Sequence, residues 1–159
     1  PCQAAQLSVT SSGLETINSG VDDNECATLG VPLSFPVNEI IEKATIDTST
    51  SGTLTVDSTV QGVVFLNSNQ TANRTINFSN VNANMAVGES MSFAVLSTQG
   101  SSAYYFNAYQ VDGSAVTPKW QGGSAPTGGN ASSIDVYNFT LIKTASATFT
   151  VLASVSQFA

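Results

Sequence analysis

Apolar and polar residues alternate along several short stretches after residue 52. In the segment 53–57, Leu54 and Val56 alternate with threonines, and a period of two is typical of a strand with one buried face. Further runs rich in β-branched and aromatic residues lie at 60–66, 75–78, 90–96, 104–111, 134–143 and 147–153. Gly, Asn, Ser and Asp separate the runs, without a long helical pattern between them. The pattern predicts an all-β domain, an antiparallel β-sandwich or jelly roll.

Two connections carry turn signals. Asp112-Gly113 lies between two apolar runs, and this dipeptide favours a two-residue hairpin turn. The segment 144–146 separates the last two runs and predicts a closing hairpin.

The start of the chain lacks this periodicity. Pro32 and Pro36 favour extended backbone around them, so we interpret residues 1–36 as an extended N-terminal arm and 37–159 as the β-sandwich domain. The stretch 37–44 fits a helical face, but β-branched residues follow it, so helix and strand both stay open.

Charge is scarce and unevenly placed. The chain has 11 acidic residues, 4 basic residues and no His, for a net charge of −7. Six of the acids and none of the bases fall in residues 1–42, so 43–159 holds five acids against four bases. So few cations argue against binding to nucleic acid and to an anionic membrane surface. The division predicts an acidic arm joined to a nearly neutral domain.

The residues needed for most catalytic sites are missing. Without His, the chain has no Ser-His-Asp or Cys-His arrangement. Among the acids of the β region, Asp112 is explained by its turn and Asp135, where a strand begins, by a solvated edge. The cluster Asp22–Glu25 lacks the alternate spacing of a calcium loop. We therefore expect no enzyme activity, no cofactor and no metal site.

The two cysteines, Cys2 and Cys26, both lie in the acidic arm. A disulfide between them would stabilise the chain by about 3 kcal/mol and would require an oxidising environment. Two separate thiols are the alternative.

One glycine-rich segment contains the only tryptophan near its start and is the candidate binding loop. Its first residues are Lys119, Trp120, Gln121, Gly122 and Gly123. Such a loop can form a ligand surface. Alternatively, Trp120 plugs one end of the sandwich and the glycines allow positive φ angles around it.

Aromatic residues suggest a second candidate. Tyr104 and Tyr105, together with Tyr109 and Trp120, could stack on sugar rings. The alternative is that these rings face the core, as half of the aromatic residues in strands must.

The segment 112–127 closely resembles a segment of small virion structural proteins of tailed phages, marine phages in particular. It contains K-W-x-G-G-x-A-P-T at 119–127, which is similar to a motif of tail-fibre-like β domains. The resemblance covers roughly 40–159, and its specific part is 112–159. It implies a β-sandwich module on the particle surface, a homotrimer and no catalysis, and no catalytic residue is carried over from it.

Within a virion, two roles are open. One is a tail-fibre or appendage module for host attachment, which would bind a host surface glycan. The other is a capsid decoration (cement) protein, whose arm would contact other virion proteins. A secreted carbohydrate-binding or adhesion module is a third alternative.

Overall fold

The computed structural model describes residues 9–10, 13–14 and 43–159. The chain divides into two units, Pro1–Ile40 and Ile41–Ala159. In the first unit, β1 (Val9–Thr10) pairs antiparallel with β2 (Gly13–Leu14). The predicted disulfide between Cys2 and Cys26, the acidic cluster Asp22–Glu25 and the choice between helix and strand at 37–42 lie outside the described residues.

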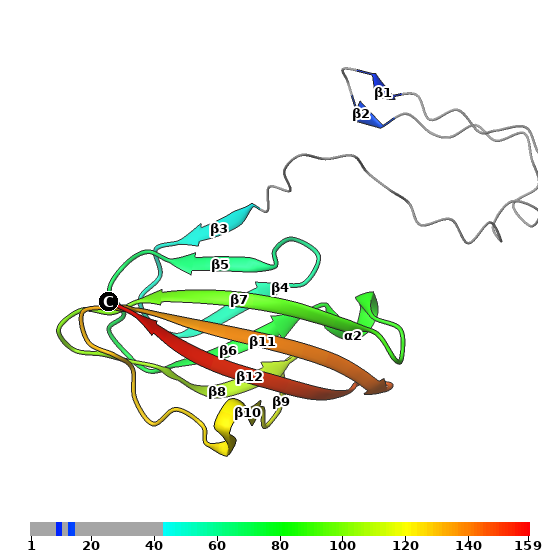
Figure 1. Cartoon of the computed structure of the whole chain (residues 1–159). Coiled ribbons are helices and arrows are strands. Elements are labelled where there is room, and N and C mark those ends of the chain that lie inside the picture. The colour runs from blue at the N-terminus through cyan, green and yellow to red at the C-terminus, as the bar shows by residue number, and fades with distance from the viewer. Residues whose placement is uncertain (1–8, 11–12, 15–42) are drawn as a thin grey trace, which may run out of the picture. The chain divides into compact units, whose positions relative to one another are not determined.

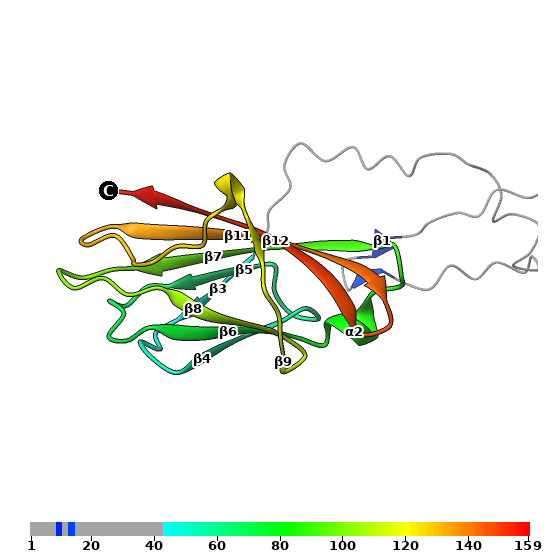
Figure 2. The ribbon, with the colours of Figure 1, turned by 90° about the horizontal axis from the view of Figure 1, so that it is seen from below.

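The second unit is a sandwich of two β-sheets, which confirms the predicted all-β class (Figures 1 and 2). In spatial order, the six-stranded sheet contains β10 (Lys119–Trp120), β12 (Thr148–Phe158), β11 (Ile134–Ala145), β7 (Ser90–Thr98), β5 (Val63–Leu66) and β3 (Ala44–Asp47). The four-stranded sheet contains β4 (Thr53–Asp57), β6 (Arg74–Ser79), β8 (Phe106–Val111) and β9 (Ser114–Ala115). A short helix, α2 (Val81–Asn84), and a 3-10 turn, η1 (Gln121–Gly123), complete the unit.

The strand directions correct the predicted antiparallel pairing, because both sheets are mixed. From β3 to β8 the chain crosses to the other sheet after every strand. As a result β3, β5 and β7 run parallel to one another, and so do β4, β6 and β8. Among the described strands of the sandwich, antiparallel pairs are β7–β11, β11–β12 and β8–β9. The alternation of residues could not reveal this, since its period is two in either direction.

Both predicted turns are present. Asp112 and Gly113 have φ angles of 49° and 78°, which suit a two-residue hairpin turn between β8 and β9. The closing hairpin turns at 146–147, slightly later than predicted, and β11 and β12 extend beyond the predicted runs.

The core is built from aromatic and aliphatic side chains of both sheets. The ring centre of Phe78 lies 4.9 Å from that of Phe93 and 5.0 Å from that of Phe139. Tyr137 and Phe139, two residues apart on β11, stack with their ring planes 6° apart. All four rings are almost completely buried. Each such side chain contributes about 2 kcal/mol through burial alone.

Asp135 is completely buried, which corrects the expectation of a solvated edge. Both of its oxygens accept hydrogen bonds from Asn130, one from the backbone N–H at 3.0 Å and one from Nδ2 at 2.6 Å. Hydrogen bonds of this kind are what allow a carboxyl group to be buried. The loop before β11 is thereby fastened to the strand.

Charged side chains hold α2 at both ends. The carboxylate of Asp112 accepts the backbone N–H groups of Val81 and Asn82 at 3.1 and 2.8 Å. Lys143 Nζ donates to the carbonyls of Asn82 and Met85, both at 2.7 Å. A negative group at the start of a helix and a positive group at its end both suit the helix dipole. Asp112 therefore serves the helix as well as its own turn.

Arg74 connects β6 to the loop between β3 and β4. Its side chain is 4% exposed. The guanidinium donates to the carbonyls of Ser49 and Gly52 and to Gln70 Oε1, at 2.9 to 3.1 Å. Burial lowers the pKa of the guanidinium, and Asp47 opposes that shift.

Candidate functional site

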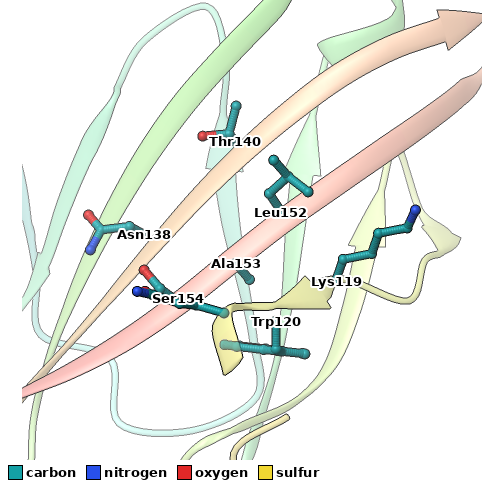
Figure 3. Close-up of a pocket in the computed structure, with 8 residues that line it drawn as sticks. Lys119, Trp120, Asn138, Thr140, Leu152, Ala153 and Ser154 are labelled. Carbon is teal, nitrogen blue, oxygen red and sulfur yellow. The ribbon is translucent and has the colours of Figure 1, made fainter. Parts of the chain in front are cut away.

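The predicted loop residues lie at one edge of the six-stranded sheet. β10 pairs parallel with β12, with Lys119 opposite Leu152 and Trp120 opposite Ala153. Successive side chains of a strand point to opposite faces, so Lys119 shares the outer face with Leu152 and Trp120 points inward with Ala153 (Figure 3).

Trp120 packs against the core. Its ring centre lies 5.5 Å from that of Tyr109 and 6.4 Å from that of Phe139. The ring thereby joins β8 of one sheet to β11 of the other. Gly122 and Gly123 have φ angles of 77° and 84°, as the packing alternative required. Trp120 is therefore a plug on the side of the sandwich.

An open hollow of about 380 Å³ lies beside β10, and Figure 3 shows residues that line it. Its lining residues are Lys119, Trp120, Gln121, Asn138, Thr140, Leu152, Ala153 and Ser154. They offer one ammonium group together with neutral amide, hydroxyl and aliphatic groups. Such a lining can hydrogen-bond a neutral, hydroxyl-rich ligand or a polar protein surface.

A second hollow, of about 520 Å³, lies between β8 and the segment 115–125. Tyr109, Val116, Pro118 and Trp120 contribute to its walls. Trp120 thus borders both hollows. The Tyr109 hydroxyl donates to the carbonyl of Phe106. Burial raises the pKa of Tyr109 well above its usual range, and Tyr105 adds to the effect.

Tyr104 and Tyr105 lie elsewhere, in the connection from β7 to β8. The backbone N–H of Tyr104 donates to Gln99 Oε1 at 2.9 Å, and that of Tyr105 donates to Asn73 Oδ1 at 3.1 Å. Both tyrosines border a gap beside Arg74 that is too narrow for a water molecule. The structure therefore joins Tyr109 to Trp120 but places Tyr104 and Tyr105 beside this gap.

Four outward residues of the first hollow were not singled out in the sequence: Asn138, Thr140, Leu152 and Ser154. Alternation in β11 and β12 places all four on one face, which the sequence does indicate. Their meeting with Lys119 depends on the parallel pairing of β10 with β12, which has no local sequence signal.

The glycine pair 128–129 gives a matched test of packing in this loop. A Cβ atom on Gly129 would lie 2.3 Å from the carbonyl oxygen of Tyr104, whereas one on Gly128 would meet nothing within 4 Å. We expect Gly129→Ala to lower the free energy of unfolding by about 2 kcal/mol, because backbone must move. Gly128→Ala should change it by less than about 0.5 kcal/mol. Urea denaturation measures both, and equal effects would contradict the close approach.

Within the described ranges, no three His, Cys, Asp or Glu side chains gather as a metal ion would need. In the same part of the chain, no helix has the length and apolar character to cross a membrane. No family model, curated protein or solved structure matches this chain.

Proposed function

We propose that this protein is a non-enzymatic structural protein of a tailed bacteriophage, displayed on the particle surface. Its role there is a tail-fibre or appendage module or a capsid decoration protein. The resemblance of residues 112–159, and of the segment 119–127 above all, carries the proposal.

The positions of the motif residues support it. Trp120 packs on the core, Pro118 is buried, and Gly122 and Gly123 adopt positive φ angles. The residues that carry the resemblance are thus ones that shape the sandwich. The resemblance in this segment therefore concerns residues that determine how the sandwich packs.

The charge distribution also favours a protein displayed in many copies. Residues 43–159 hold five acids and four bases, a net charge of −1. Like charges repel when copies crowd on a surface, and a nearly neutral domain avoids that cost. The acidic segment 1–36 then contacts other virion proteins, and the particle carries the domain as a homotrimer. In a tail fibre the ligand would be a host surface glycan.

The test is to find the chain in purified phage particles. Trypsin cleaves after Arg74, Lys119 and Lys143, so peptides 75–119 and 120–143 identify it by mass spectrometry. We expect both peptides in particles purified by density gradient, and antibody labelling on intact particles. Hundreds of copies per particle would indicate decoration, and a few dozen or fewer would indicate a fibre. Peptides found only in the particle-free culture fluid would overturn the proposal.

That last outcome would favour a secreted carbohydrate-binding or adhesion module. The lining of the hollow beside Lys119, one ammonium group among amide and hydroxyl groups, is the observation that supports this alternative. Glycan binding by the purified protein that is lost in Gln121→Ala would strengthen it, because Gln121 is exposed and its loss leaves the core intact.

A further inference from the structure

The outer face of the six-stranded sheet carries a row of apolar side chains. The register places Ile46 beside Phe65, Phe65 beside Leu96, and Leu96 beside Val136. The residues flanking Phe65, Leu96 and Val136 on their own strands are buried, so these three side chains point outward. Ile46, on the edge strand β3, is 56% exposed. The row therefore crosses four neighbouring strands.

Apolar residues also flank this row. On one side the register aligns Ala44, Val63 and Ala94, and on the other it pairs Ile134 with Phe158, which is 61% exposed. In the described part of the chain, five large apolar side chains are strongly exposed, and three of them, Ile46, Leu152 and Phe158, lie on this face. Exposed apolar groups are thus concentrated here rather than scattered.

From β3 to β12 this face is uncharged, and the charge it does carry is Lys119, on the edge strand β10. None of the outward positions of the described strands β3, β5, β7, β11 and β12 holds Asp, Glu, Lys or Arg. Its polar residues are hydroxyls and an amide, such as Ser92 and Thr140, whose side chains hydrogen-bond each other at 3.3 Å. The outer face of the four-stranded sheet differs, because β4 and β6 present Thr53, Thr55, Asp57, Thr75, Asn77 and Ser79 there.

The size of the face suits an interface. The strands β3, β5, β7, β11 and β12 hold 4, 4, 9, 12 and 11 residues, so at about 3.3 Å per residue and about 4.8 Å between strands they span roughly 600 Å². Stable protein interfaces use about 800 Å² of each partner, and this face, with its apolar row and the hydroxyl-bearing residues beside it, approaches that size.

We propose that a second copy of this chain packs on this face, sheet against sheet. The chain carries a net charge of −7, and an uncharged face can meet its own copy without opposing like charges. Hydroxyl groups both donate and accept hydrogen bonds, so identical faces can pair. A partner recognised through charge would find no counter-ion on β3, β5, β7, β11 or β12, and only Lys119 at the β10 edge. Two copies that pack face to face form a dimer. Three copies that turn this face toward a common axis form a trimer. The inference assigns a face to the self-association that the proposed homotrimer requires, and it is argued from the sheet itself rather than from the particle assignment.

Charge placed in the apolar row tests the proposal. We expect the purified full-length protein to show a dimer or trimer mass by light scattering at micromolar concentrations. Leu96→Lys should weaken association at least 30-fold, because each copy would bury an unpaired ammonium. Ile46→Lys, at an already exposed side chain, should weaken it without a risk to folding. The matched control is Thr75→Lys on the opposite outer face, which should leave association unchanged.

A protein that stays monomeric at every concentration would overturn the proposal. The proposal would also fail if Leu96→Lys, Ile46→Lys and Thr75→Lys all associated equally strongly. Photo-crosslinking decides whether another part of the same chain covers the face instead. With Leu96→p-benzoylphenylalanine in the full chain, we expect crosslinked dimers or trimers on a denaturing gel. Crosslinks confined to single chains would contradict self-association.

Discussion

Replacing Phe139 by alanine is expected to lower the free energy of unfolding by about 4 kcal/mol. The Phe139 side chain is 1% exposed and lies among the rings of Phe78, Tyr109, Trp120 and Tyr137. Its removal leaves a cavity at the point where both sheets and the Trp120 plug meet. The loss therefore includes the transfer free energy of the ring and the contacts of its neighbours.

Urea denaturation followed by tryptophan fluorescence measures this loss, because Trp120 is the only tryptophan and touches Phe139. The control is Asn138→Ala, one residue away on the same strand but on the outer face, which should change stability by less than about 0.5 kcal/mol. A loss below about 1.5 kcal/mol for Phe139→Ala would show that the neighbouring rings collapse into the space.

Replacing Arg74 by alanine is expected to lower the free energy of unfolding by about 3 kcal/mol, because three acceptors lose the hydrogen bonds that the buried guanidinium donates. These are the carbonyls of Ser49 and Gly52 and the amide oxygen of Gln70. Since two of them belong to the β3–β4 loop, hydrogen exchange should accelerate first in residues 48–52. Arg74→Lys should recover only part of this loss, because it keeps the charge but its ammonium reaches fewer acceptors than the guanidinium does.

Lys119→Ala is the matched control for Arg74, because it removes the same charge from an exposed side chain. It should leave the free energy of unfolding within about 0.5 kcal/mol of the original value. Equal losses for the two variants would mean that net charge, rather than the hydrogen bonds of Arg74, governs stability.

Features with a local cause could be predicted from the sequence. Alternation around Leu54 and Val56 places both in the core, and the Asp112-Gly113 dipeptide adopts its expected turn. Strand direction could not be predicted, because it depends on which sheet the chain enters next. The same alternation of apolar and polar residues is found in strands joined by a hairpin and in strands joined by a crossover.

The candidate site divides in the same way. The role of Trp120 as a plug was one of two alternatives in the sequence, and the contacts with Tyr109 and Phe139 support it. Arg74 and Asp135 gave no sign of burial, since a charged residue usually lies on the surface. Their burial depends on partners that loops supply. For Arg74, Ser49 and Gly52 lie more than 20 residues away along the chain.

The crossing of the chain between sheets from β3 to β8 has a consequence for folding. Each parallel pair, such as β3 with β5, encloses a whole intervening strand, so it forms only after a loop of that length has closed. The long β11–β12 hairpin is the most local large pairing, and it follows all the crossing strands along the chain. Apart from this hairpin, the large strand pairs of the crossing region join residues far apart in sequence, which predicts slow folding of the sandwich.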